Sequence, residues 1–318
     1  MPHLHLDNIA QNDNLRGDVI TQSVDHQLMI QPPGVAAAGH GLFGAEQAML
    51  TDVGIPGVNH TTILPWMPDI AGGDWLNQHA VFVVGLAYAG FIDEYCGRTY
   101  SMPLAVYHAL RHDEFGLMAA FMELVATPND HAYYGKIEHF LDAAHVEGKS
   151  WCLLDLCRAS MVLRRVINGR VFDDSRERNI TRNAATRQRF EAYFAANTGW
   201  TRKRFELSAA RHIVSLGRAA EAGVLRMFLA DNWLQDPEVT PIHHPGFHPP
   251  VGDPQLALTP NWLLCNFGPK PRLWSVKGRL NGVNRVWTLI ALAHPSARGV
   301  AWPNAMNLAA HYLAEHLV

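Results

Sequence analysis

Three short apolar runs end in residues that could carry out chemistry on a ligand. The first run, Ala80–Ala87, ends in a Gly-Leu-Ala triplet, the second, His212–Ala220, passes through Gly217, and the third, Ala291–Ser296, ends in His294, proline and serine. Apolar, β-branched runs of this length are typical of buried strands, and open α/β sheets bind ligands where such strands end. An imidazole there can donate a hydrogen bond to charge that develops during a reaction. The three runs therefore predict a single site.

The basic segment, Arg158–Arg211, is the second feature that could bind a ligand. It holds 13 Arg or Lys residues against 5 Asp or Glu residues, whereas the whole chain has a net charge of −3. A basic stripe on one face can hold phosphates even in an acidic protein. A solvated helical surface explains the same charges, so both interpretations stay open.

A histidine-rich stretch, Pro237–Pro260, is predicted to be a loop because prolines interrupt it throughout. It contains His243, His244 and His248, and imidazole is a common ligand of zinc. No carboxylate or cysteine joins them at ligand spacing. A surface loop is therefore favoured over a metal site, and no metal is expected.

A sheet must position the strand ends. Strands are predicted at Val81–Gly85, Trp151–Leu156, His212–Leu216 and Val286–Ala293. Helices are predicted at Pro103–Ala126, His131–His145, Ser160–Arg170 and Thr181–Ala196, in the stretch that leads into His212, and at Arg218–Asp231 and Met306–Leu317. Strands that alternate with helices predict an α/β three-layer sandwich with a central, mostly parallel, four-stranded sheet. Residues 76–318 would form this domain, and residues 1–75, which are irregular in composition, would form an N-terminal wrapping arm.

Composition and cysteine usage indicate a globular cytoplasmic protein. The start of the chain has no basic leader followed by an apolar stretch, and no run of about 18 apolar residues could span a membrane. Four cysteines are scattered without a Cys-x-x-Cys pair, so neither a disulfide framework nor a zinc ribbon is indicated. We expect no membrane partner.

The strand-end motifs resemble the uracil-DNA glycosylase superfamily, and its B-type branch most closely. The first motif of that branch looks like Gly-Leu-Ala-Pro-Ala, followed after a spacer by Gly-Arg, an apolar residue and Phe. This chain has Gly-Leu-Ala-Tyr-Ala from Gly85 and Gly-Arg-Thr-Tyr from Gly97. The strand that ends at Arg158 is similar to the branch's Asn-bearing strand. Leu-Gly-Arg at 216–218 and His-Pro-Ser from His294 resemble its later motifs.

This resemblance covers roughly residues 80–318 and implies an enzyme that rotates a base out of the DNA stack before cutting its glycosidic bond. The residues it assigns to substrate binding are Gly85, Leu86, Ala87, Tyr88, Tyr100 and Asp155. Those it assigns to DNA are Arg158, Ser296 and Arg298. Tyr100 would stack on the base, although its residue type fits a core tyrosine equally well. His294 would stabilise the departing base anion, or else is a structural histidine.

Asp155 is a departure from the superfamily pattern, which has Asn at this position. An ionised Asp only accepts hydrogen bonds, so it opposes a uracil carbonyl and suits the amino group of cytosine. The resemblance and this departure together point to a modified cytosine, as in phage-defence glycosylases that remove α-glucosyl-hydroxymethylcytosine. Asp155 could instead be protonated by burial, cap backbone amides or serve as the catalytic carboxylate.

The group that activates water is not evident, because Leu86 and Ala87 occupy the positions where relatives often carry Asp or Asn. Asp93 and Glu94 lie between the two halves of the first motif and are the catalytic candidates beside His294. The cysteines do not match the iron–sulfur ligands of some relatives. No cofactor is therefore expected.

The predicted function is a monofunctional DNA glycosylase that leaves an abasic site, acts in antiviral defence and has DNA as its partner. Three alternatives stay open: a uracil-DNA glycosylase, a nucleotide- or sugar-processing hydrolase on the same fold, and a non-catalytic sensor of modified DNA. The hydrolase would show no dependence on DNA. The sensor would bind DNA without leaving an abasic site.

Overall fold

The computed structural model describes residues 70–72, 76–87, 132–144, 146, 151–157, 164–167, 170–173, 184–295 and 302–317. The chain forms two compact units. One comprises residues 1–71, 87–130 and 157–201, and the other comprises residues 72–86, 131–156 and 202–318. The boundary expected between residues 75 and 76 stays a prediction. The second unit contains most of the described residues and carries the strand ends of interest.

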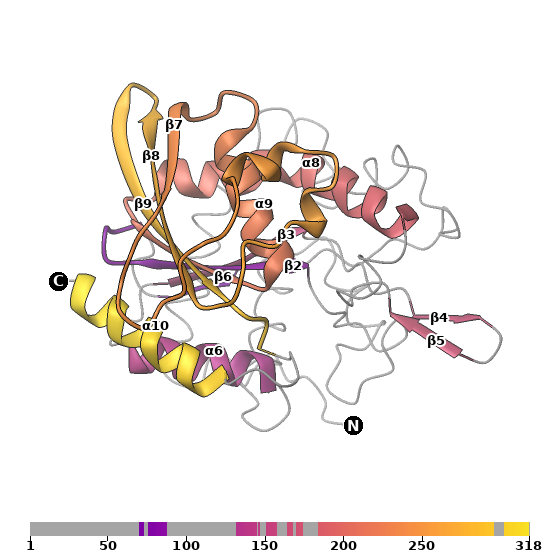
Figure 1. Ribbon diagram of the computed structural model, residues 1–318, viewed down its shortest axis with the longest axis horizontal. Helices are drawn as coiled ribbons and strands as arrows, with labels where there is room; N and C mark the ends of the chain where they lie inside the picture. Colours follow the sequence, from indigo (N-terminus) through magenta and orange to yellow (C-terminus); the bar gives the residue numbers. More distant parts are fainter. Residues whose placement is uncertain are drawn as a thin grey trace, which may run out of the picture. The chain divides into compact units, whose positions relative to one another are not determined.

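The main sheet has seven strands in the order β1-β3-β2-β6-β9-β8-β7 (Figure 1). Their bounds are β1 Ile70–Gly72, β2 Val81–Ala87, β3 Trp151–Cys157, β6 His212–Leu216, β7 Gln235–Pro241, β8 Arg272–Leu280 and β9 Val283–Leu292. All four predicted strands are present and lie next to one another, as β3, β2, β6 and β9. The prediction of a four-stranded sheet was wrong, because β1, β7 and β8 extend it.

The sheet is mixed, with parallel strands at its centre. Strand β6 pairs in parallel with β2 on one side and with β9 on the other. Strands β9, β8 and β7 then pair antiparallel. The turn between β8 and β9 is Asn281-Gly282, and both residues have positive φ, 51° and 79°. A two-residue turn of this kind matches the twist of a hairpin, which explains why β8 folds back onto β9.

Helices cover both faces of the sheet in the second unit. Helix α9, Arg218–Leu229, packs on β6 and β9, and α10, Trp302–His316, packs on β9 and on α6, Ala132–Ala143. Figure 1 shows α9 on one side of the sheet and α6 with α10 on the other. The described fold is therefore mixed α/β with helices on both sides of the sheet.

Aromatic rings fill the layer between the sheet and α9. The ring of Phe205, near the end of α8 (Ala184–Leu207), lies 4.4 Å from the ring of Phe82 and 5.7 Å from that of Phe228. Phe228 in turn lies 4.9 Å from the ring of Trp287. These rings come from β2, α8, α9 and β9, so burial of their apolar surface holds the parallel strands against the helices.

The basic segment folds differently from the prediction. A helix at Ser160–Arg170 is wrong, because β4, Arg164–Ile167, and β5, Arg170–Asp173, pair antiparallel there. The helix predicted at Thr181–Ala196 and the separate helix predicted before His212 form one continuous helix, α8, which ends at Leu207. The predicted helix at Pro103–Ala126 lies outside the described residues.

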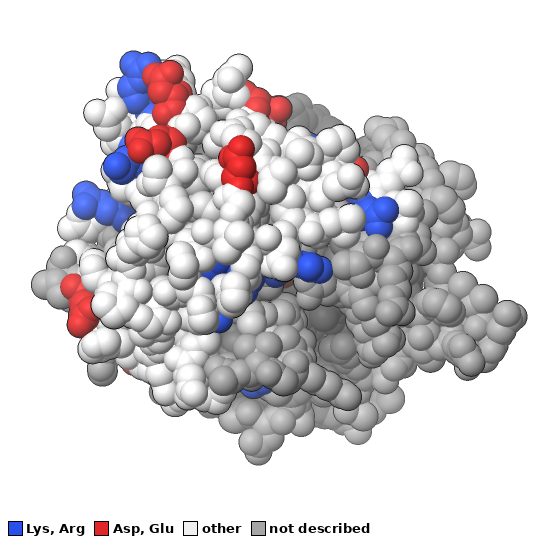
Figure 2. Space-filling view, in the orientation of Figure 1, with Lys and Arg blue, Asp and Glu red and all other residues white. Residues whose placement is uncertain are grey.

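The stretch predicted as a loop at Pro237–Pro260 is also partly regular. Strand β7 occupies its beginning, and the short 3₁₀ helices η4, Pro254–Leu258, and η5, Trp262–Leu264, pack against α9. Where β7 and β8 lie, acidic and basic side chains are neighbours on the surface (Figure 2). None of the helices in the described part of the chain combines the length and apolar character needed to cross a bilayer.

Candidate active site at the carboxyl ends of the strands

The three strand ends singled out in the sequence meet at one edge of the sheet. In the register of the parallel strands, Val84 of β2 is level with Ser215 of β6, and Leu216 is level with Leu292 of β9. Past the end of β6, the Gly217 N–H donates to the Leu292 carbonyl oxygen over 2.9 Å. The three runs therefore end at the same edge of the sheet, and their prediction as a single site stays a prediction.

His294 follows β9 by two residues, and its side chain is exposed. It lies beside Gly217, where a Cβ atom would be 3.6 Å from the Cβ of His294. Gly217 has a φ of 103°, which L-residues with side chains rarely adopt. The glycine therefore serves the sharp turn from β6 into α9, directly beneath the imidazole.

Two lysines hold the backbone on either side of His294. Lys270 donates from Nζ to the Leu292 carbonyl oxygen over 2.9 Å, so this oxygen accepts a second hydrogen bond in addition to that of Gly217. Lys136, on α6, donates from Nζ to the Pro295 carbonyl oxygen over 2.7 Å. The loop that presents the imidazole is thus fixed at both ends by charge-assisted hydrogen bonds.

Lys270 is in turn held by a buried carboxylate. Glu221, in the first turn of α9, is fully buried and lies 3.6 Å from Lys270 Nζ. It accepts hydrogen bonds from Trp274 Nε1 over 2.9 Å and from Arg272 Nε over 3.1 Å, and it makes a second contact with the same guanidinium. We call Glu221, Lys270, Arg272 and Trp274 the Glu221 cluster. Sequence reasoning missed it, because Glu221 is separated from the other three members by about 50 residues along the chain.

The amino end of α9 lies next to the loop that carries His294. No side chain caps this helix, whose N-cap residue is Gly217. The first backbone N–H groups of a helix carry partial positive charge and favour a negative charge nearby. Burial raises the pKa of the neighbouring Cys265 thiol, while the positive charge of Arg218 acts in the opposite direction and Glu221 raises it further.

Asp155 is buried within β3, with 6% of its surface exposed, between two buried leucines. Strand β3 is the neighbour of β2, which carries the buried Gly85 and the half-buried Leu86, and Ala87 is the last residue of β2. The structure therefore brings these predicted site residues onto adjacent strands. A buried carboxylate of this kind requires polar partners or a proton.

Several predicted site residues lie outside the described residues. They are Tyr88, Asp93, Glu94, Tyr100, Arg158, Ser296 and Arg298. Their roles in stacking, water activation and DNA contact stay predictions.

Two members of the basic segment are engaged within the protein. Arg202 donates to the carbonyl oxygens of Met227 and Ala230 at the end of α9 and pairs with Asp231 over 3.2 Å. Arg204 is buried, with 2% of its surface exposed. Both side chains serve the packing of α8, so they do not offer charge to an external phosphate.

In the part of the chain that the structure describes, no group of three His, Cys, Asp or Glu side chains is arranged to hold a metal ion. His244, from the histidine-rich stretch, packs edge-on against Phe247 and Tyr312.

Comparison with known proteins gave no match to any family model and none to any curated protein.

Proposed function

We propose that this protein is a monofunctional DNA glycosylase that flips a base out of DNA and excises it, and that the base is a modified cytosine. The observation that carries the proposal is an exposed imidazole, His294, on a loop fixed by two lysines at the carboxyl edge of parallel strands. The strand order β3-β2-β6-β9 supports a uracil-DNA-glycosylase-like core, to which the outer strands are additions.

The chemistry follows from where charge develops. When the glycosidic bond breaks, electrons move onto the base, so a hydrogen-bond donor at the base carbonyl stabilises the transition state more than the ground state. His294 is the donor, and the adjacent amino end of α9 adds a favourable field for the departing anion. Water completes the reaction at the sugar, with Asp93 or Glu94 as the residue that orients it.

Asp155 supports cytosine as the parent base. A carboxylate accepts hydrogen bonds only, and cytosine offers an exocyclic amino group where uracil offers a carbonyl. Asp155 lies on β3, the neighbour of the strand β2 that carries Gly85 and Leu86, which places it among the predicted base-binding residues. Because excision of ordinary cytosine would damage the host genome, the substrate carries a substituent, such as a glucosylated hydroxymethyl group.

An abasic-site assay tests the proposal directly. Purified protein is incubated with matched DNAs that contain uracil, cytosine, hydroxymethylcytosine or glucosylated hydroxymethylcytosine, and abasic sites are then cleaved with alkali. We expect cleavage only of DNA with a modified cytosine, loss of that cleavage in His294→Ala and its retention in His311→Ala, an exposed histidine on α10.

The possible outcomes separate the candidate functions. Cleavage at uracil would keep the enzyme class and overturn the substrate. Binding of modified DNA without cleavage would indicate a sensor. A folded protein that neither cleaves nor binds any of the DNAs would overturn the proposal and favour a hydrolase of small molecules. Cleavage that persists in His294→Ala would remove the imidazole from the mechanism.

A further inference from the structure

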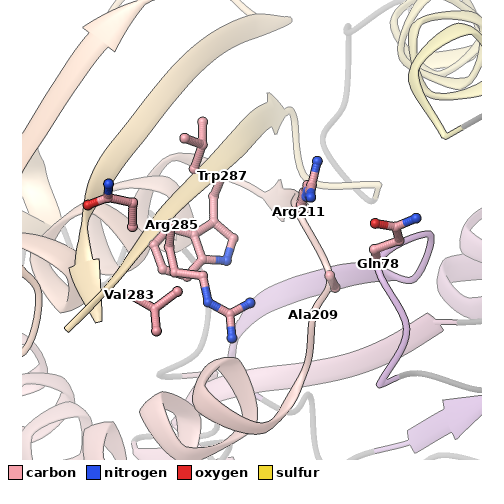
Figure 3. A pocket seen from close by; sticks show the side chains of 9 residues that line it. Gln78, Ala209, Arg211, Val283, Arg285 and Trp287 are labelled. Carbon is pink, nitrogen blue, oxygen red and sulfur yellow. The ribbon is translucent and has the colours of Figure 1, made fainter. Parts of the chain in front are cut away.

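A cavity lies at the opposite edge of the sheet, where the start of β9 extends beyond the first residue of its neighbour β6. His212, the first residue of β6, is level with Thr288, so the stretch Val283–Trp287 pairs with β8 alone. The space beside this stretch forms a cavity of about 380 Å³ (Figure 3). Its lining residues are Gln78, Ala209, Ala210, Arg211, Val283, Asn284, Arg285, Val286 and Trp287. A cavity of this size falls within the range of about 300–1,000 Å³ that is typical of small-molecule sites.

The cavity contains two arginines without acidic partners. The nine described residues that line it include no Asp or Glu. Among the described residues, neither Arg211 nor Arg285 forms an ion pair, whereas Arg272 and Arg279 pair with Glu221 and Asp236. The two unpaired guanidinium groups give the cavity an excess of positive charge.

The Arg285 guanidinium has N–H groups that are not used in hydrogen bonds. Its Nε is buried and has no hydrogen-bond partner, and its Nη1 reaches only the Ser208 carbonyl oxygen, at 3.5 Å. A buried donor without a partner costs free energy, which a bound acceptor would recover. Figure 3 shows the Arg285 guanidinium and the Trp287 indole nitrogen turned to the same side of β9, toward the segment that carries Ala209. Both are groups that only donate.

Apolar side chains form the remaining walls. Val283, which is 58% exposed, shares a face of β9 with Arg285, and Ala209 and Ala210 also line the cavity. From these observations we propose that the cavity binds the carboxylate of a small organic anion, with Arg285 on the carboxylate, Arg211 adding positive charge at the rim and Val283 against an apolar body. The planar guanidinium fork matches a carboxylate in geometry.

This site is separate from the proposed active site. It lies at the amino ends of β6 and β9, whereas His294 lies beyond their carboxyl ends. Its binding test therefore needs no DNA and no excision activity. Failure of the glycosylase proposal would leave it standing, and its own failure would leave the glycosylase proposal standing.

The experiment uses fluorine NMR on the full chain with para-fluorobenzoate as the probe and para-fluorobenzamide as its uncharged match. We expect the benzoate to bind and the benzamide not to bind. Arg285→Gln should weaken benzoate binding at least about tenfold, because it removes a charge-assisted hydrogen bond, and Arg211→Gln about threefold, because that side chain is exposed. Arg279→Gln, outside the cavity, should leave the affinity unchanged.

Defined results would overturn the proposal. Equal binding of benzoate and benzamide would mean that charge is not recognised. Binding of inorganic phosphate in the absence of benzoate binding would identify a site for a different anion. Unchanged affinity in Arg285→Gln would also overturn it. Circular dichroism checks that this variant folds, and Arg211→Gln tests the same cavity from an exposed position that does not contribute to the core.

Discussion

At the scale of single residues, the structure positions His294 through the carbonyl groups around it. Leu292 and Pro295 flank the imidazole, and their carbonyl oxygens accept hydrogen bonds from Lys270 and Lys136. A loop held at both ends loses little further freedom when substrate binds. The lysines are therefore positioning residues of the proposed reaction.

Lys136→Met should reduce the single-turnover rate of base excision about tenfold, because small displacements of a catalytic group have large effects on rate. The dissociation constant for substrate DNA should stay unchanged, since Lys136 is committed to Pro295. Lys136→Arg should restore part of the rate, and Lys277→Met, at an exposed position on β8, is the matched control. An equal loss of DNA affinity would show that Lys136 contacts DNA instead.

Asp155→Asn should shift base preference from a modified cytosine toward uracil, because an amide can donate to a uracil carbonyl and a carboxylate cannot. The measurement is the ratio of excision rates on the two DNAs, which cancels any general loss of activity. A correct base contact contributes about 1–3 kcal/mol of discrimination, so a change in this ratio of tenfold or more is expected. An unchanged ratio would exclude Asp155 from base reading.

At the scale of elements, the Glu221 cluster joins the first turn of α9 to β8 and to the loop before β8, which contains Lys270. Its carboxylate is fully buried together with the guanidinium of Arg272. Removal of one partner from a buried pair leaves the other charge unneutralised. The same contacts connect the core to Lys270 and, through it, to the end of β9.

Glu221→Gln should therefore lower the free energy of unfolding by about 3–5 kcal/mol, measured by urea denaturation. The matched control is Asp236→Asn, which breaks the exposed pair with Arg279 and should change stability by less than about 1 kcal/mol. Similar losses in both variants would mean that the buried pair contributes no more than a surface one.

The sequence predicted the elements that combine a strong apolar pattern with clear ends. Strand β6, His212–Leu216, is predicted with its observed bounds, because a short apolar, β-branched run precedes Gly217. Helix α9 ends two residues before its predicted end at Asp231, where Asp231 and Asn232 adopt positive φ. Local chemistry determines both features, so they can be read from the chain.

Hairpins were the main error, although their signal is in the sequence. Asn168-Gly169 separates β4 from β5, and Asn281-Gly282 separates β8 from β9. Asn-Gly between apolar β-branched residues is a strong indication of a hairpin, but the arginines around Asn168-Gly169 favoured a helix.

The contact between Lys136 and Pro295 spans 159 positions, and no local pattern could have predicted it.

At the scale of the whole molecule, the two edges of the sheet differ in their titratable groups. The amino-end edge carries His212, which is buried at the start of β6 and whose Nδ1 has no hydrogen-bond partner among the described residues. Burial, together with smaller electrostatic contributions from His316, Arg211 and His79, lowers the pKa of His212 to about 4. These three neighbours come from α10, from the segment before β6 and from the segment before β2. Folding therefore holds His212 neutral.

Acid should destabilise the protein through this histidine. In the unfolded chain His212 takes up a proton below about pH 6.5, whereas in the folded chain it does so only below about pH 4. The unfolded state thus binds more protons between these values, so stability falls as the pH decreases through them. Between pH 7 and pH 5 we expect the free energy of unfolding to fall by about 2 kcal/mol through His212 alone, at about 1.4 kcal/mol per unit of pKa shift.

Urea denaturation of the wild type and of His212→Gln at both pH values measures this loss of stability. The wild type should lose about 2 kcal/mol more than the variant, and His311→Gln, at an exposed site, should behave as the wild type does. Equal losses in the wild type and His212→Gln would mean that the folded protein accepts a proton on this imidazole as readily as the unfolded chain does.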